Sequence, residues 1–188
     1  MLYWDTLDAF LADASTIAAR QQFDYLRARI EWASAPRAWA IAADAGDTMR
    51  TPLDALAPSR MTDVETFDLL ANARIDVSSQ WTYYAPCAEL VVPFPDGADL
   101  VRELVSDVQR GPLWGHLARG ASLALVRGTT DLPHSPFAFP YCGVLALRPE
   151  PRDLAAALEV QRELRALADR AVAAGARVYL ASFSSEDA

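Results

Sequence analysis

Hydrophobic positions change their spacing repeatedly between residues 87 and 183. Short runs that are rich in β-branched residues and bounded by proline or glycine predict strands. Apolar residues three and four positions apart predict helices. The predicted elements are, in chain order, strand 87–93, helix 95–110, strand 122–126, strand 141–147, helix 153–174 and strand 177–183. This β-α-β-β-α-β order is typical of a ferredoxin-like unit.

The longest predicted helix begins near Asp153 and ends before Gly175, a residue type that is common just past a helix end. Its apolar residues recur at helical spacing, which predicts one buried stripe. We expect this stripe to contain Leu154, Leu158, Leu164, Leu167 and Val172.

The first half of the chain carries a weaker version of the same pattern. Thr6 is a plausible N-cap for an amphipathic helix, and residues 26–32 alternate apolar and charged side chains, as in a half-buried strand. Further predicted elements are strand 2–4, strand 39–43, a helical turn at 52–57 and strand 64–70. We therefore predict an α+β fold, with an antiparallel sheet, helices on one face and two ferredoxin-like βαββαβ units. The halves, about 1–75 and 80–185, would form one domain spanning residues 1–188.

Length, composition and charge narrow the class of protein. The chain has 188 residues and 52% hydrophobic content, enough to bury a core. We expect no membrane segment, because no apolar run reaches the ~18 residues that a spanning helix needs. Without an evident signal peptide, the expected location is cytoplasmic. A net charge of −8 argues against nucleic acid as a partner, because phosphates require a basic surface.

The sequence lacks the residues that several classes of catalytic or cofactor site require. All 17 basic residues are arginine, which excludes a P-loop lysine and a Schiff-base lysine. No Gly-x-Gly-x-x-Gly occurs, so a Rossmann dinucleotide site is not supported. His116 and His134 lack a second His or Cys at ligand spacing, and we expect no metal site. Cys87 and Cys142 fall in predicted strands and are interpreted as small buried hydrophobes rather than a disulfide.

Several segments together resemble one flavoenzyme family. They are Tyr3–Asp13, the run Trp81-Thr-Tyr-Tyr-Ala-Pro-Cys-Ala-Glu-Leu-Val-Val-Pro93, Gly120–Val126, Tyr141–Leu147, Leu154–Gly175 and Val178–Leu180. In order and spacing they resemble the substrate domain of the cytokinin dehydrogenases, which are FAD-linked oxidases that remove the side chain of an adenine-type plant hormone. The resemblance implies the C-terminal substrate-binding (cap) domain of an FAD-dependent oxidoreductase.

The departures from this family define the candidate site. Trp81 matches the family's aromatic residue. The position of the family's substrate-stacking Trp is occupied here by Cys87, and that of the family's Asn is occupied by Glu89. The family's FAD-binding domain, which carries the flavin-linked His and the catalytic Asp, has no counterpart here. The resemblance therefore implies no catalytic residue in this chain, with FAD bound mostly by a separate domain or chain. The substrate would be a small amine or alcohol rather than a cytokinin.

Strand alternation gives a partly independent argument for the site. If Leu90 and Val92 face the helices, then Cys87, Glu89 and Val91 face the other side of the sheet. Glu89 is the best candidate for a substrate contact, and the competing interpretation is a sheet-edge carboxylate that pairs with arginine or faces water.

Two functions stay open on these grounds. A cap domain predicts an exposed apolar sheet face opposite the helices. The alternative is a stand-alone α+β module that binds a small molecule or dimerises without catalysing a reaction.

Overall fold

The computed structural model describes residues 2–20, 25–31, 37–43, 56–61, 86–117 and 120–181. Trp81 and the predicted strand at 64–70 lie outside these residues, as does most of the predicted helical turn at 52–57.

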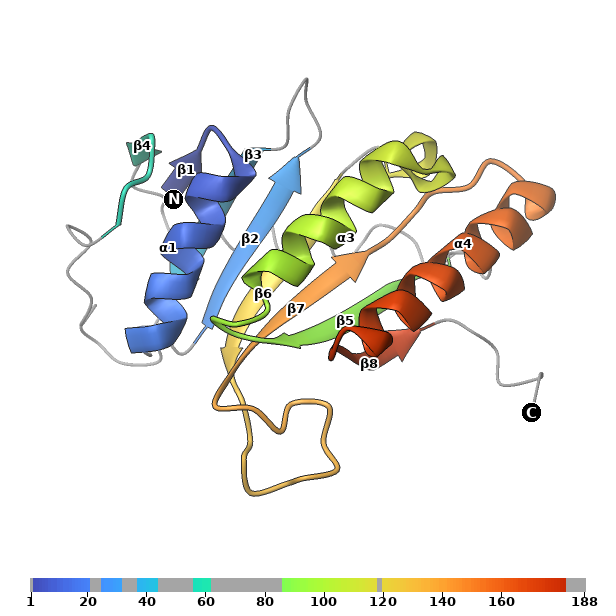
Figure 1. The fold of residues 1–188 in the computed structure, drawn as a ribbon. Helices are drawn as coiled ribbons and strands as arrows, with labels where there is room; N and C mark the ends of the chain where they lie inside the picture. Colours follow the sequence, from blue (N-terminus) through green and yellow to red (C-terminus); the bar gives the residue numbers. More distant parts are fainter. Residues whose placement is uncertain are drawn as a thin grey trace.

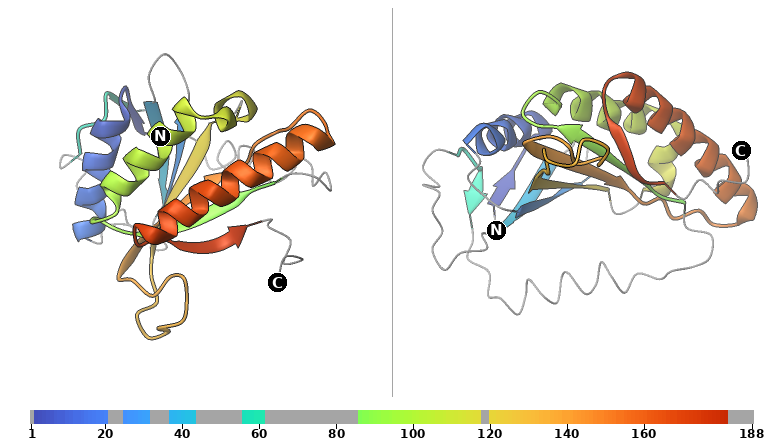
Figure 2. Two further views of the ribbon diagram at one scale, coloured as in Figure 1. Left: turned by 45° about the vertical axis from the view of Figure 1, so that its right-hand side comes forward. Right: turned by 90° about the horizontal axis from the view of Figure 1, so that it is seen from below.

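The described residues form one antiparallel sheet with helices packed on it, which confirms the α+β class. The strands are β1 (Leu2–Trp4), β2 (Tyr25–Glu31), β3 (Arg37–Ala43), β4 (Arg60–Met61), β5 (Ala88–Pro93), β6 (Ala121–Arg127), β7 (Tyr141–Leu147) and β8 (Arg177–Ala181). The helices are α1 (Leu7–Arg20), α3 (Ala98–Arg110) and α4 (Leu154–Ala173), with the short 3-10 helix η2 (Pro112–His116) after α3. Figures 1 and 2 show α1, α3 and α4 side by side on one face of the sheet.

The eight strands follow the spatial order β4-β1-β3-β2-β6-β7-β5-β8, and every pair is antiparallel. From β5 onward the element order is β-α-β-β-α-β, as the hydrophobic pattern predicts. Within each half the first strand lies between the third and the fourth, and the second strand lies beyond the third. Pairing of β2 with β6 joins the halves into one sheet.

Capping residues set the helix starts. The hydroxyl of Thr6 accepts a hydrogen bond from the Ala9 backbone N–H at 3.2 Å, so this predicted N-cap of α1 is confirmed. The carboxylate of Asp153 accepts one from Ala156 at 2.8 Å and caps α4. Helix α3 begins three residues later than predicted, at Ala98, because residues 94–97 form a turn after β5.

The predicted buried stripe of α4 is partly wrong. Leu154, Leu158 and Val172 are 58%, 53% and 48% exposed, whereas Leu164 and Leu167 are buried as predicted. Alanines complete the buried face in their place, because small side chains let the helix lie close to the sheet. The buried residues of α4 are Ala157, Val160, Leu164, Leu167, Ala168 and Ala171.

The hydrophobic core lies between the helices and one face of the sheet. Its strand residues alternate along the chain, as a half-buried sheet requires. They include Ala28, Ile30, Leu90, Val92, Leu123, Leu125, Leu145 and Leu147. At its margin the indole N–H of Trp4 and the Ala57 N–H each donate to the buried Asp13 carboxylate at 2.7 Å, which ties α1 to the segment before β4.

Candidate functional site on the open sheet face

The sheet face opposite the helices is the candidate site, and we call it the open face. Leu90 and Val92 belong to the helix-side core, which places Glu89 and Val91 on the open face, as predicted. The register of β7 with β5 and with β6 shows which residues of these three strands lie on the same face as Glu89. Its central residues are Glu89, Val91, Ser122, Ala124, Val126, Cys142, Val144, Ala146 and, just past β7, Arg148.

Glu89 and Arg148 form an ion pair on this face. Nη2 of Arg148 donates a hydrogen bond to Oε1 of Glu89 at a distance of 2.8 Å. The Glu89 side chain is only 12% exposed, while that of Arg148 is 61% exposed. A carboxylate so far out of water needs a charged partner, and Arg148 supplies it. Oε2 of Glu89 has no hydrogen-bond partner in the part of the chain that the structure describes, so it can accept a proton donor from a ligand.

Small side chains surround this carboxylate. Ala146 lies opposite Glu89 on β7, and Ser122 lies opposite Ala146 on β6. In the next row Ala124 and Val144 are both only partly buried. The result is a mostly apolar surface of small side chains with one fixed carboxylate at its side, which suits an apolar group that carries an amine or hydroxyl.

Of the other two predicted site residues, only one can be placed. Cys87 precedes β5 and is partly buried, with a thiol that is not in a disulfide. Side chains alternate between the two faces of a strand, so Cys87 and Glu89, two residues apart, lie on the same side of β5. Trp81 lies outside the described residues.

The chain itself covers one end of the open face. The β6–β7 connection, residues 128–140, packs against it, and Sγ of Cys142 lies 3.8 Å from the Phe137 carbonyl oxygen. Val91 and Cys142 are accordingly fully buried, although neither belongs to the helix-side core. Burial raises the pKa of the Cys142 thiol to about 11, against the opposing charge of Arg177. The face predicted to be exposed is therefore covered to a large extent. Ser122, Ala124, Val126 and Val144 are partly buried, and Ala146 is 8% exposed.

Two site features escaped the sequence analysis. The pairing of Arg148 with Glu89 depends on the β5–β7 register, which a pattern of apolar residues does not specify. The packing of loop 128–140 on the sheet depends on contacts with residues far away in the sequence, such as Arg177 on β8. The only signal was its density of proline and aromatic residues.

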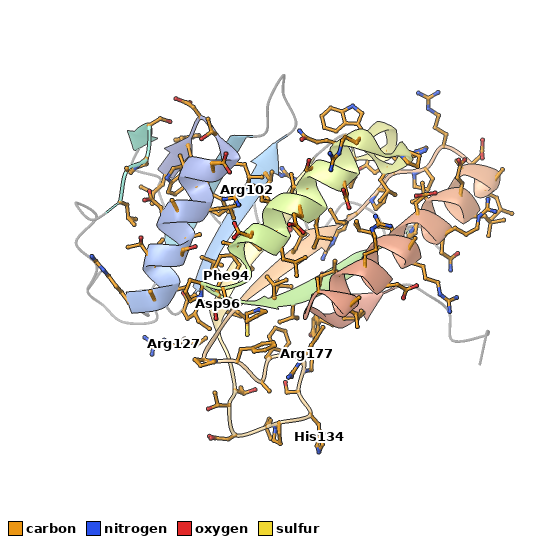
Figure 3. All side chains as sticks on the ribbon, viewed as in Figure 1. Phe94, Asp96, Arg102, Arg127, His134 and Arg177 are labelled. Carbon is orange, nitrogen blue, oxygen red and sulfur yellow. The ribbon has the colours of Figure 1, made fainter. Side chains whose placement is uncertain are left out.

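A second polar feature lies on the helix side, between α1 and the start of α3. It is an open groove of about 450 Å³. Arg102 binds both Asp8, at 2.5 Å, and Asp99, and these two carboxylates raise the pKa of its guanidinium. Figure 3 shows Arg102 on α3, with Asp96 near the helix start. The one cationic side chain of this groove, Arg102, is already paired with two of its carboxylates, so it is a weaker candidate than the open face.

The described residues also bear on metal binding and on membrane spanning. They contain no group of three or more His, Cys, Asp or Glu side chains placed to hold a metal ion. Within the same ranges, no helix has the length and apolar character required to span a membrane.

Comparison of the chain with protein-family models gives no match, and comparisons with curated proteins and with solved structures give none either. The function must therefore be argued from the residues and the geometry of the open face.

Proposed function

We propose that this chain is the substrate-binding (cap) domain of an FAD-dependent oxidoreductase related to the cytokinin dehydrogenases. The open face would orient a small amine or alcohol over the flavin. The observation that carries this proposal is the sheet face opposite the helices, where small side chains, buried at Ala146 and partly buried at Ser122, lie beside the fixed carboxylate of Glu89.

The proposed fold assignment is a pair of ferredoxin-like units. Each half arranges its strands in the same relative order, and the second half has both connecting helices among the described residues. In this assignment the described helices α1, α3 and α4 cover one face, which leaves the opposite face of both units to a partner.

The residues at hand fit the ring of a flavin better than its phosphates. Ser122, Ala124 and Ala146 are small and lie in adjacent positions of β6 and β7, where a ring could stack against the sheet. A pyrophosphate is usually held by backbone N–H groups in a glycine-rich turn at a helix start, and the sequence has no Gly-x-Gly-x-x-Gly. We therefore assign the binding of FAD to a separate domain or chain.

Glu89 would act on the substrate by position rather than by chemistry. Its Oε2 accepts a hydrogen bond from a substrate amine or hydroxyl, and Arg148 keeps the carboxylate in place. The apolar residues around it exclude water from the reacting carbon. When bound, the flavin supplies the hydride acceptor, and no residue of this chain is assigned a catalytic role.

Co-expression with the polypeptide encoded immediately upstream tests this proposal. The 188-residue chain purified alone should be colourless, and the complex should be yellow with bound FAD. A yellow preparation of the chain alone would contradict the assignment of FAD binding to a separate domain or chain. A colourless complex, or no complex, would count against the cap assignment.

One observation favours the alternative function, a stand-alone module that dimerises. Strand β8 is an edge strand, and next to it α4 exposes several large apolar side chains, a combination that invites pairing with a second copy. The exposed large apolar residues on these two elements are Leu154, Leu158, Val172, Val178 and Tyr179. Sedimentation equilibrium of the chain, compared with Leu158→Glu, would separate the two functions, because only the dimerising module predicts a dimer that this substitution dissociates.

A further inference from the structure

Arg177 begins β8 at the covered end of the open face. It lies opposite Val91, which places its side chain on the open face, and it is partly buried. In Figure 3 this side chain lies beside loop 128–140, below the sheet.

Loop 128–140 is held in one conformation by hydrogen bonds between its own residues. The Thr129 N–H donates to the Phe137 carbonyl at 2.8 Å, and the Ser135 N–H donates to the Leu132 carbonyl at 2.9 Å. At its base Gly128 lets the two strands of the loop approach, because a Cβ there would lie 1.6 Å from the Phe139 carbonyl oxygen. The groups that this loop presents to Arg177 are therefore fixed in advance.

Two of these groups hold the guanidinium. Nη1 of Arg177 donates to the Ser135 carbonyl at 2.5 Å, and Cζ lies 4.4 Å from the centre of the Phe139 ring. This places the guanidinium over the ring in a cation–π arrangement. Of five N–H donors, only the one bonded to Ser135 has an acceptor within the described residues.

The charge of Arg177 has no carboxylate partner among those residues. In this it differs from Arg102, Arg110, Arg148 and Arg170, each of which forms an ion pair. The surroundings are also unusual for a chain with a net charge of −8. Figure 3 shows Arg127 and His134 at the same end of the molecule, and the loop contains a single carboxylate, Asp131.

We infer that Arg177 and loop 128–140 form a binding site for an oxyanion, the carboxylate or phosphate group of a ligand. The planar guanidinium offers a pair of parallel N–H donors that matches two oxygens of either group. The ring of Phe139 and the Ser135 carbonyl orient this pair before the anion arrives. The inference stands apart from the proposed cap function, since it requires no flavin and no partner chain.

The test follows the side-chain Nε–Hε NMR signal of Arg177 in the 188-residue chain while sodium acetate or sodium phosphate replaces sodium chloride at constant ionic strength. The site predicts a saturable shift, with a Kd on the order of 1–10 mM. Saturation by acetate alone assigns a carboxylate site, saturation by phosphate alone assigns a phosphate site, and saturation by both supports the shared chemistry. A signal that does not move, or that moves linearly together with exposed Arg162, overturns the inference.

Matched variants provide a second arm. Arg177→Lys keeps the charge but loses the paired donors, and it should weaken binding about tenfold as followed by the backbone N–H signals of Ser135, Phe137 and Phe139. Arg162→Lys, on the outer side of α4, should leave binding unchanged. Equal affinities in the two variants would contradict the proposed site.

Discussion

The two faces of the sheet differ in what their side chains do. On the helix side, Leu90, Leu123 and Leu145 are fully buried and pack into the core. On the open face their neighbours along the same strands include the charged Glu89 and the smaller Ser122, Ala124 and Ala146, while Val91 is fully buried. The first face is built for stability, and the second is built with far less apolar volume than a core would use. We therefore expect a ligand to bind on the open face.

The largest contrast should come from two neighbours on β7. Leu145 is fully buried on the helix side, and Val144 is partly buried on the open face. Leu145→Ala should lower the free energy of unfolding by about 3 kcal/mol, because it leaves a cavity in a packed core. Val144→Ala should cost at most about 1 kcal/mol. Urea denaturation of both variants measures the difference, and equal losses would show that the open face is packed like a core.

The covered end of the open face should be sensitive to alkaline pH. The thiol of Cys142 has its pKa raised from 9.0 to about 11 by burial. Between these values the unfolded chain releases this proton while the folded chain retains it, so the stability falls as the pH rises. Cys142→Ala should remove on the order of 2–3 kcal/mol of this loss from unfolding curves measured between about pH 9 and pH 11. Cys87→Ala is the control, and an equal effect of both substitutions would contradict the burial of Cys142 beneath loop 128–140.

Gly143 tests the closeness of packing on the helix side. A Cβ at this position would lie 2.5 Å from the Phe94 ring and 3.2 Å from Leu123 Cδ1. Gly143→Ala should therefore cost about 2 kcal/mol by overpacking, as measured by thermal unfolding. Gly115→Ala has nothing within 4 Å of its added methyl group and should stay within about 0.5 kcal/mol of the parent chain. Similar values for both would mean that Phe94 moves aside at no cost.

Local patterns predicted much of this fold but little of how its parts meet. The spacing of apolar residues gave the element order after residue 86, and strand alternation gave the face of Glu89, because both depend on nearby residues. The stripe of α4 was partly mispredicted, since apolarity alone does not distinguish an exposed Leu158 from a buried Ala157. The partner of Glu89 and the position of Arg177 depend on strand register and on the return of a loop, which are properties of distant segments.

Binding of benzylamine to the 188-residue chain, followed by amide NMR, tests the open face most directly. The account predicts shifts that centre on Glu89 and Ala146, with affinity about tenfold weaker in Glu89→Gln, because the carboxylate that accepts the amine is gone. Glu103→Gln, an exposed change on α3, should bind like the parent chain. Shifts confined to the groove between α1 and α3, equal affinity in the two variants, or no binding would contradict the assignment of the open face as the substrate site.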